Sequence, residues 1–490
     1  MSTQFSSWEF NPTPPPAARW GASPPPIEEE PSATGPLEPS WSREELAVVV
    51  GLVLLSLILR FHDYTLAPLF ADNFHEVQFV WLGMNLFLHG DPITWSNFPV
   101  YSSFQPYPFL GATPGLVHHW MDQPPLFGYI MGGWALLLGD RDLSQATAAQ
   151  ARFLPIVFSS ASVPLVYLLG RSLLGRFPSM VGAALLATAP AAVLLGREGE
   201  PESLQAILLL AALICCAQIL RRNSSRWIVG LLLGCCLLAP LLKVPGVAIA
   251  GICAVILLFD RRWQLAALTG GAGILGLLLY ALYGLIVDWH LFVAVVGQQA
   301  AFRINVISAL DFIADPTGIN RPLHDGWWLF GLFGVGALLL ATQRGKELFL
   351  AWPVVAYAVT MMLLAGQRQT AQYGWYKIII YPEVYLAAGY LIWEFVSRYS
   401  SVGWLLLLTL GGATATNWWL GGADHLWIPN PLLLVVIIAI VVLPPLWVKL
   451  SPDDLRAKAA AKWVAIASLA FLALGNLVES WNLAHTFFYM

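Results

Sequence analysis

The sequence predicts an all-α protein that crosses a membrane about 13 times, counted as apolar runs near the ~20 residues that span a bilayer. Three observations support this fold class. Of the 490 residues, 58% are hydrophobic and 11% are charged, against about 25% charged in soluble domains. The mean hydropathy is +0.66, and apolar runs recur along the whole length. Lys and Arg gather in alternate loops, which matches the preference of basic residues for the inner side of a membrane.

The composition excludes several classes of protein and site. The net charge of −4 excludes the usual basic surface of a nucleic-acid-binding protein. No cleavable signal peptide is expected, because the first 45 residues are polar and no small-residue cleavage site follows the first apolar run. Five cysteines lie within apolar runs, so we interpret them as small buried hydrophobic residues, not as disulfides or metal ligands. They are Cys215, Cys216, Cys235, Cys236 and Cys253.

Two regions follow one another along the chain. Residues 1–42 are rich in Pro and include the run Glu28-Glu29-Glu30, which predicts a disordered cytoplasmic tail. Residues 43–490 form the predicted transmembrane domain, and its first span is 46–61. The later spans are predicted at 152–170, 178–196, 203–220, 227–242, 245–259, 263–287, 326–342, 348–366, 378–396, 402–420, 431–448 and 462–478.

One further apolar run, residues 124–139, is short for a span. If it does not cross the membrane, the basic loops fall on the same side as the N-terminus. If it does cross, those loops move outside, against the usual preference. We therefore predict a helix lying at the outer interface, begun by Pro124-Pro125. Residues 62–151 then form the first outer loop, and the outer segments hold most of the carboxylates, His and Trp.

The start of this loop carries a candidate base. Residues 74–88 have apolar side chains at helical spacing, which predicts an amphipathic interface helix. Glu76 fits two interpretations, because it matches a capping box with Asn73 and is also a carboxylate beside the membrane. Asp72 precedes the cap and is not explained by it. Ionisable groups beside a membrane are costly to hold there, so we regard Asp72 as a functional residue.

Further along the loop, Asp122 and two histidines are candidates. Asp122 precedes Pro124-Pro125, where it either caps the interface helix or takes part in chemistry. His118 and His119 suggest a metal site, but adjacent side chains point in different directions, which disfavours a shared ion. The alternative is a pair of solvated interfacial histidines.

The later outer segments offer carboxylates and cations. The turn 197–202 contains Glu198, Glu200 and Glu202, which is more than the dipole of the next helix requires. One of the three can bind a divalent cation or a sugar hydroxyl, and the sequence leaves the metal open. Lys243, Arg368 and Lys377 either extend to the surface or bind a lipid phosphate. Because these outer cations break the positive-inside trend, we favour phosphate binding.

These residues occur in the order seen in C-type integral-membrane glycosyltransferases. The chain resembles the branch of protein O-mannosyltransferases and aminoarabinose lipid A transferases, over roughly residues 46–395. The resemblance rests on the motifs Asp72…Glu76, Asp122-Gln-Pro-Pro-Leu, Ala151-Arg152-Phe153-Leu154-Pro155, Arg197…Pro201-Glu202, Lys243-Val-Pro-Gly and Tyr376-Lys377-Ile-Ile-Ile-Tyr381-Pro382.

The resemblance implies a polyprenyl-phosphate-linked sugar as donor and a protein, lipid or glycan acceptor outside the cytoplasm. It also implies that an acidic residue of the first outer loop is the catalytic base. We expect the plasma membrane of a prokaryote, with the active site facing outward. The chain departs from the family at Asn73, where Glu is frequent, at Gln123, where His or Lys is usual, and at Glu202, where Asp is usual.

The predicted site residues follow from these motifs and their chemistry. A lipid phosphate is a good leaving group once cations balance its charge. The acceptor hydroxyl needs a base, and carboxylates stabilise an oxocarbenium-like transition state. The predicted catalytic residues are Asp72, Glu76 and Asp122, and the predicted substrate-binding residues are Lys243, Arg368, Lys377, Tyr376, Arg152, Glu202, His118 and His119.

Two alternatives to a glycosyltransferase stay open at this point. A lipid or solute transporter would show paired repeats and charges at mid-span, whereas here the unusual charges gather at one face and no repeat is visible. An inactive, divergent member of the family would act as a membrane scaffold.

Overall fold

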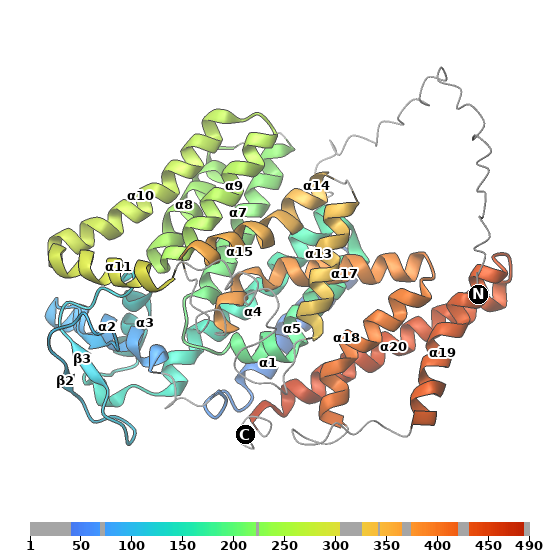
Figure 1. Cartoon of the computed structure of the whole chain (residues 1–490), viewed down its shortest axis with the longest axis horizontal. Helices are drawn as coiled ribbons and strands as arrows, with labels where there is room; N and C mark the ends of the chain where they lie inside the picture. The colour runs from blue at the N-terminus through green and yellow to red at the C-terminus, as the bar shows by residue number, and fades with distance from the viewer. Residues whose placement is uncertain are drawn as a thin grey trace, which may run out of the picture. The chain divides into compact units, whose positions relative to one another are not determined.

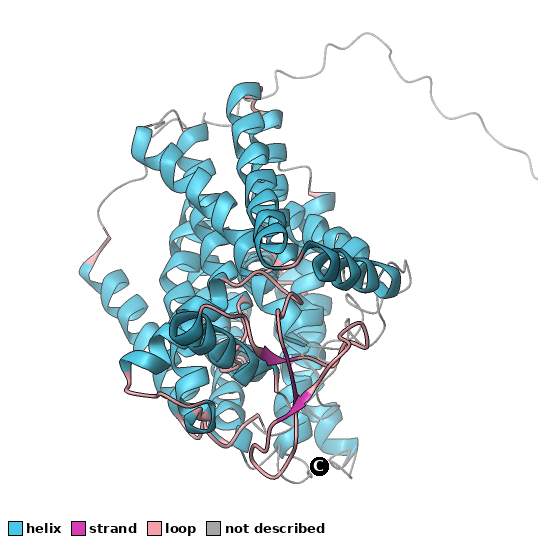
Figure 2. Ribbon diagram, turned by 90° about the vertical axis from the view of Figure 1, so that its left-hand side faces the viewer, coloured by secondary structure: helices cyan, strands magenta, loops and turns pink. Residues whose placement is uncertain are grey.

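The computed structural model of the chain describes residues 41–68, 74–221, 225–303, 326–341, 344–364, 374–419 and 431–484. In this part of the chain nearly every residue outside one loop-rich region is helical, and one small sheet lies in that region (Figures 1 and 2). The predicted all-α fold class is therefore confirmed. Residues 1–40 of the predicted tail lie outside the described residues.

The elements of the first 303 residues lead from one long helix through the loop-rich region into a helical bundle. They are α1 (Arg43–Phe61), α2 (His75–His89), β1 (Thr94–Trp95), β2 (Gln105–Pro106), β3 (Gly115–Val117), α3 (Leu126–Leu137), η1 (Leu143–Gln145), α4 (Ala148–Leu174), α5 (Arg176–Thr188), α6 (Pro190–Leu195), α7 (Glu202–Leu220), α8 (Arg226–Leu242), η2 (Val244–Gly246), α9 (Val247–Phe259), α10 (Trp263–Val287) and α11 (Trp289–Arg303).

The rest of the described chain is helical. Its elements are α13 (Gly326–Leu340), α14 (Arg344–Lys346), η4 (Glu347–Ala351), α15 (Trp352–Leu364), η5 (Gly374–Ile380), α17 (Tyr381–Ser397), α18 (Ser401–Trp419), α19 (Pro431–Leu450) and α20 (Leu455–Trp481).

Helices occupy the predicted apolar runs. Six helical stretches of the described residues are long and apolar enough to cross a membrane, and further apolar helices are shorter. The long ones are α4, α7, α10, Glu347–Leu364, Gly374–Ser397 and α20. A membrane forces a spanning chain into helices because no water is present to satisfy its backbone groups. The total of about 13 spans stays a prediction.

The predicted span 178–196 is interrupted where α5 ends and α6 begins. The carbonyl of Leu186 would normally bond to the N–H four residues on, but Pro190 has none. The fully buried Arg60 of α1 fills this break with its guanidinium. It donates hydrogen bonds of 2.9–3.2 Å to the carbonyl oxygens of Leu186, Ala187 and Ala192. A buried cation thus satisfies backbone groups that the break exposes.

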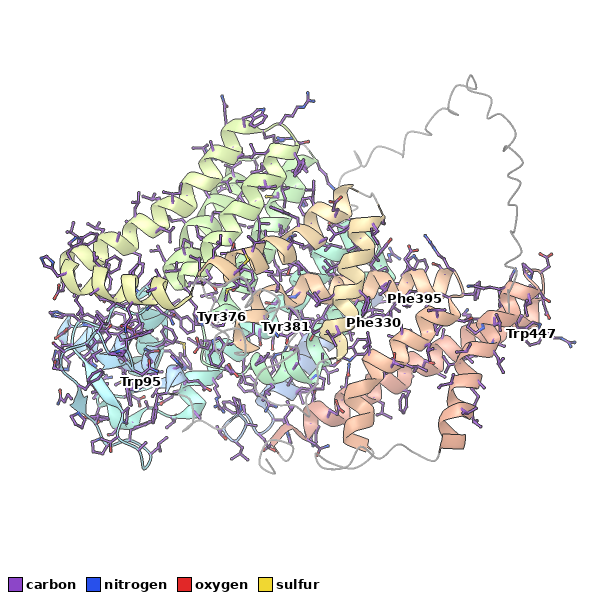
Figure 3. All side chains as sticks on the ribbon, viewed as in Figure 1. Trp95, Phe330, Tyr376, Tyr381, Phe395 and Trp447 are labelled. Atoms are coloured by element: carbon purple, nitrogen blue, oxygen red, sulfur yellow. The ribbon has the colours of Figure 1, made fainter. Side chains whose placement is uncertain are left out.

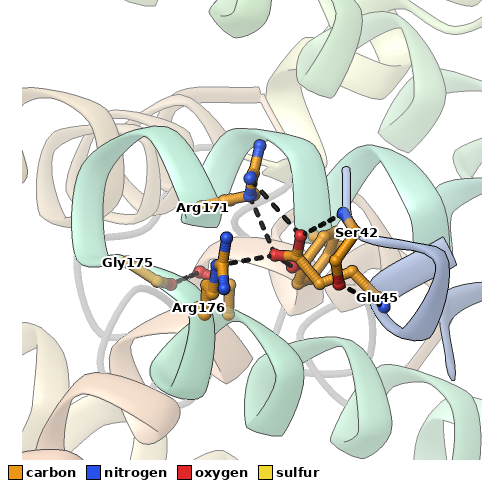
Figure 4. A network of polar contacts seen from close by, with 7 residues as sticks. Ser42, Glu45, Arg171, Gly175 and Arg176 are labelled. Carbon is orange, nitrogen blue, oxygen red and sulfur yellow. Dashed lines mark hydrogen bonds and ion pairs between the residues drawn. The ribbon is translucent and has the colours of Figure 1, made fainter. Parts of the chain in front are cut away.

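A second polar contact fastens the beginning of α1. The Glu45 carboxylate accepts a hydrogen bond of 2.7 Å from the Tyr167 hydroxyl and pairs with Arg171 and Arg176 at 3.1 and 3.0 Å (Figure 4). Glu45 also completes a capping box with Ser42. These contacts join α1 to the end of α4 and the start of α5.

Residues 62–147 connect α1 to α4 and fold around α2 and α3. Three antiparallel strands form the sheet in the order β1-β3-β2, with Thr94 opposite Val117 and Gln105 opposite Leu116. Glycines let α2 and α3 pack closely, since a Cβ on Gly83 would overlap the backbone of Gly128.

Helix α2 differs from the predicted amphipathic helix, because it is buried on nearly all sides. Val80 and Leu82, which lie off the predicted apolar face, are as buried as Trp81 on it. Gln78 and Asn85 are polar residues of this helix, and an amphipathic interface helix would turn them toward water. Their side-chain amides instead donate hydrogen bonds of 2.8 and 2.7 Å to the carbonyl oxygens of Trp95 and Ile93. The sheet therefore covers the polar face of α2.

The end of α10 and helix α11 cover the loop before α3. The Tyr280 hydroxyl donates to the Met121 carbonyl at 2.7 Å, and the Gln299 amide donates to the Asp122 carbonyl at 2.8 Å. Residues 304–325, which follow α11, lie outside the described part of the chain. The five cysteines are free and buried, as predicted.

Candidate active site

The first feature of the site is a buried ion pair between α2 and α4. Arg152 Nε donates to Glu76 Oε2 at 2.6 Å, and Arg152 Nη2 donates to Glu76 Oε1 at 2.9 Å. Neither side chain is exposed to solvent. Two parallel hydrogen bonds between a guanidinium and a carboxylate form a strong and directional contact.

This pair corrects two predictions. Helix α2 begins at His75 with Phe74 as its N-cap and no side-chain cap bond, and both Glu76 oxygens bind Arg152. The predicted capping role of Glu76 is therefore wrong. Arg152 was predicted to bind substrate, but its guanidinium is occupied by Glu76 and by the Tyr64 carbonyl at 2.6 Å. Arg152 instead contacts the chain on both sides of residues 69–73.

The turn between α6 and α7 lies directly against this pair. A Cβ on Gly199 would come within 3.1 Å of Glu76 Cβ and of the Ala151 carbonyl oxygen. The turn therefore lies in close contact with both Glu76 and the start of α4. Arg197 ties the same turn to the end of α1 through the Leu59 carbonyl at 2.7 Å.

The second feature is a cation held between two carboxylates. Lys243 Nζ lies 2.6 Å from Glu202 Oε1 and 3.2 Å from Glu200 Oε2. The ammonium also lies 4.4 Å from the centre of the Tyr376 ring, a cation–π contact. Tyr376 belongs to η5, next to Tyr381 at the start of α17 (Figure 3).

The ends of α8 and α7 place this lysine. Helix α8 stops at Leu242, and Lys243 is extended, with φ −161° and ψ 136°. The Gln205 amide on α7 donates 2.9 Å hydrogen bonds to the carbonyl oxygens of Lys243 and Ala239. Surface exposure of the Lys243 side chain, one of the two predicted alternatives, is wrong because the side chain is buried.

The ionisable side chains of this cluster favour different charge states. Burial raises the pKa of the Glu198 carboxyl well above its usual range, and the neighbouring Glu76 and Glu200 raise it further. Burial lowers the pKa of Lys243, but Glu202, Tyr376 and Glu200 together outweigh that effect and the net shift is upward. The ammonium therefore stays charged at neutral pH, while the Glu198 carboxyl favours its neutral form. Glu198 Oε2 and Glu202 Oε2 are buried and accept no hydrogen bond from any residue that the structure describes.

Asp122 forms a separate polar site in the loop before α3. Its carboxylate accepts hydrogen bonds of 2.7 Å from the Ser96 and Tyr101 hydroxyls. The alternative that Asp122 caps α3 is wrong, since Pro125 is the N-cap and no side chain caps the helix. Two hydroxyl donors hold the Asp122 carboxylate in one orientation.

The remaining predicted residues lie elsewhere or outside the described part. His118 Nδ1 and His119 Nε2 lie 3.3 and 4.0 Å from the Asp91 carboxylate, and both imidazoles are exposed. Lys377 is fully buried, with Nζ 5.2 Å from the centre of the Trp328 ring. Asp72 and Arg368 lie outside the described residues.

The histidines lie closer together than their adjacency suggests. His119 adopts a left-handed backbone conformation with φ +56°, and both histidine side chains approach the same carboxylate. Even so, within the described residues no group of three or more His, Cys, Asp or Glu side chains is placed to hold a metal ion.

The structure therefore brings together five of the predicted site residues, and four further residues matter that were not among them. Glu76, Arg152, Glu202, Lys243 and Tyr376 form one buried ionic cluster with Glu198 and Glu200. Glu200 was visible as one of three carboxylates in a short turn. Ser96 and Tyr101 carried no local signal, because their partner Asp122 is more than 20 residues away in the sequence.

The chain resembles a known protein family and several solved structures. Residues 122–308 match the model of the dolichyl-phosphate-mannose-protein mannosyltransferase family. No curated protein sequence matches the chain. The structure is similar to that of ArnT from Cupriavidus metallidurans bound to undecaprenyl phosphate, with a TM-score of 0.55 at 14% identity, over 91% of this chain and 78% of ArnT. The chain has the GT-C fold.

Two further solved structures are similar to this GT-C chain. ArnT in the apo state has a TM-score of 0.50 at 16% identity, over 91% of this chain and 78% of ArnT. The apo oligosaccharyltransferase of Archaeoglobus fulgidus has a TM-score of 0.47 at 13% identity, over 89% of this chain and 56% of that enzyme. The fold and the family match confirm the predicted resemblance and support a multi-pass membrane glycosyltransferase over the transporter alternative.

Proposed function

We propose that the protein transfers a sugar from a polyprenyl phosphate to an acceptor hydroxyl at the outer face of a prokaryotic plasma membrane. The observation that carries the proposal is the buried ionic cluster. Its members Arg152, Glu202 and Lys243 lie in the segment that matches the mannosyltransferase family. Charged side chains buried among membrane-spanning helices are costly, so they mark functional sites.

The donor is the most specific part of this proposal. The matched family is named for dolichyl-phosphate mannose, and the structurally similar ArnT was solved with undecaprenyl phosphate. The first name describes a sugar carried on a polyprenyl phosphate, and the second ligand is a polyprenyl phosphate itself. We take polyprenyl-phosphate mannose as the first donor to test, with a hydroxyl-bearing protein, lipid or glycan as acceptor.

Asp72 is the proposed general base. Arg152 contacts Tyr64 and Glu76, which flank residues 69–73, and Arg197 contacts the Leu59 carbonyl at the end of α1. Two fixed arginines therefore anchor the chain on either side of the segment that contains Asp72. A base removes the proton of the acceptor hydroxyl while the phosphate leaves.

We revise the proposed roles of the cations. Lys243 is already balanced by two carboxylates, so it does not contribute a free charge to a phosphate. We assign the leaving phosphate to Arg368 and Lys377, which flank the start of η5. Asp122, oriented by Ser96 and Tyr101, is the second proposed carboxylate and stabilises the oxocarbenium-like transition state.

The test is single-turnover transfer with purified protein, polyprenyl-phosphate mannose and a pool of Ser- and Thr-containing peptides. Asp72→Asn should lower the rate by at least ~10²-fold, the lower range for loss of a general base, and leave donor binding unchanged. Asp142→Asn is the control, because Asp142 is an exposed cap of η1. Parental transfer by Asp72→Asn, with transfer lost in Asp122→Asn, would assign the base to Asp122. An unaffected rate in both variants would contradict the mechanism.

A further inference from the structure

The turn that follows α6 presents two carboxylates to one buried ammonium. Glu200 Oε2 and Glu202 Oε1 lie 3.2 and 2.6 Å from Lys243 Nζ. We infer that these carboxylates form a seat for a divalent cation and that the Lys243 ammonium permanently occupies it. Lys243 then acts as a built-in cation, and the protein binds no divalent ion at this turn while the lysine is present.

The ligand chemistry of the seat supports this assignment. Mg²⁺ is usually bound through one or two carboxylates and several waters. Two acidic side chains that converge on one cation supply such a set. Within the part of the chain that the structure describes, Glu202 Oε2 is also buried and accepts no hydrogen bond. The seat therefore has acceptor capacity that the single ammonium does not use.

The surrounding chain holds the ammonium in this position. Gln205 fixes the backbone carbonyl of Lys243, and a Cβ on Gly246 would overlap the Gln205 amide and the Ala239 carbonyl. The Tyr376 ring lies over the ammonium on another side. The lysine side chain is only 5% exposed, so it cannot leave the seat without moving η5 or the ends of α7 and α8.

Removing the Lys243 ammonium leaves the two carboxylates without a cation. Glu200 and Glu202 are 2% and 0% exposed, and two buried carboxylates without a cation are strongly destabilising. Protonation or a metal ion must then neutralise them. Lys243→Ala leaves a space at the carboxylates and should create a Mn²⁺ site that the parent protein lacks.

The experiment measures Mn²⁺ binding by electron paramagnetic resonance in purified parent protein, Lys243→Ala and Lys243→Ala/Glu202→Gln. The parent should bind no Mn²⁺ at this turn, Lys243→Ala should bind one equivalent, and the double variant should bind at least ~10-fold more weakly, as expected when a metal site loses a determinant. Mn²⁺ should also raise the melting temperature of Lys243→Ala and leave that of the parent unchanged. Lys243→Gln replaces the alanine variant if the latter does not fold.

Two results would overturn the inference. One is a Mn²⁺ site in the parent protein that disappears in Glu202→Gln. The other is folded Lys243→Ala and Lys243→Gln proteins that bind no Mn²⁺. One consequence for catalysis rests on the proposed function. Sugar transfer should continue when a metal chelator is added. Because Mn²⁺ binding is read without any substrate, a failure of transfer in every protein would count against the proposed function alone.

Discussion

The Glu76 carboxylate and the Arg152 guanidinium form two hydrogen bonds, of 2.6 and 2.9 Å, across 76 residues of sequence. The pair joins the first turn of α2 to the first turns of α4. Both side chains are fully buried, so each charge depends on the other. The contact fixes the start of α2 against α4.

Breaking this pair should destabilise the protein strongly. Arg152→Met leaves the Glu76 carboxylate buried without its cation, which costs about 3–5 kcal/mol. We expect a large fall in the melting temperature of the detergent-solubilised protein. Arg398→Met is the matched control, because Arg398 forms an ion pair with Glu394 while 76% exposed, and exposed pairs contribute about 0–1 kcal/mol. Equal melting temperatures for the two variants would contradict the buried role of Arg152.

Close packing of α2 on α3 gives a second prediction. A Cβ on Gly83 would overlap the Gly128 carbonyl and come within 2.8 Å of Gly132 Cα. Gly83→Ala must therefore push the two helices apart, and overpacking of this kind typically costs about 1–3 kcal/mol. Gly51→Ala on α1 meets no atom within 4 Å and should be neutral or slightly stabilising. Thermal unfolding of both variants tests this, and an unchanged Gly83→Ala protein would refute the close approach.

The helices were predictable because their signal is local. Apolar runs such as 263–287 coincide with α10, since any chain within a bilayer must form helix. The burial of α2 was not predictable in the same way. Its polar residues Gln78 and Asn85 find partners on β1 and beside it, and no periodicity within α2 reveals a sheet that covers it. The break at Pro190 was missed, because 178–196 was predicted as one span, and its partner Arg60 lies more than 120 residues away in the sequence.

The hydroxyl contacts of Asp122 give a third prediction. Tyr101→Phe removes a 2.7 Å hydrogen bond to a buried carboxylate and the acceptor of the Met121 N–H. An unsatisfied buried group costs about 1–3 kcal/mol, so we expect a lower melting temperature and about a 10-fold slower transfer. Tyr107→Phe is the control, because the hydrogen bond that it removes is a 3.2 Å contact to the exposed Asp142. Its melting temperature and its transfer rate should stay close to those of the parent. A parental transfer rate in Tyr101→Phe would mean that Asp122 takes no part in the reaction.

In the candidate site, too, the sequence revealed single unusual residues but not their partners. The turn 197–202 and Lys243 each stood out as polar residues in apolar surroundings, but their direct pairing joins residues 41 and 43 positions apart. A sequence shows that Lys243 is unusual; it does not show that two carboxylates already balance it. For that reason the sequence favoured phosphate binding by Lys243, whereas the geometry favours an internal ion cluster.

Glu198 gives a prediction about pH. Its folded-state pKa lies above the ordinary glutamate value, so the folded protein holds this proton over a range in which the unfolded chain has released it. Stability contributed by the neutral carboxyl is therefore lost as pH rises, by about 1.4 kcal/mol per pH unit above about pH 4.3, until the folded-state pKa is reached. Glu198→Gln removes the titrating group.

The stability difference between Glu198→Gln and the parent should therefore widen in favour of the variant as pH rises from about 5 towards 8. Melting temperatures measured over this range test the sign. Glu394→Gln, which changes a 23% exposed carboxylate whose partner Arg398 is 76% exposed, is the control and should show no such trend. A difference that is constant with pH would mean that Glu198 titrates normally in the folded protein.

The last prediction concerns which side of the membrane each loop faces. Helix α3 has 12 residues, so it is ~18 Å long and too short for a ~30 Å hydrocarbon core. We therefore expect it to lie at the outer interface, which places Ser144 outside and, three predicted spans later, Arg226 inside. Both positions are exposed, and the five native cysteines are buried. Single Ser144→Cys and Arg226→Cys variants should therefore react with a membrane-impermeant maleimide against a low background.

In intact cells Ser144→Cys should be labelled, and Arg226→Cys should be labelled only after permeabilisation. The reversed result would mean that residues 124–139 cross the membrane and that the basic loops face outward. Labelling of both variants in intact cells would mean that an even number of the helices between them cross. The interrupted pair α5 and α6 is then the first candidate, because Pro190 divides it into helices of 13 and 6 residues, each shorter than a span.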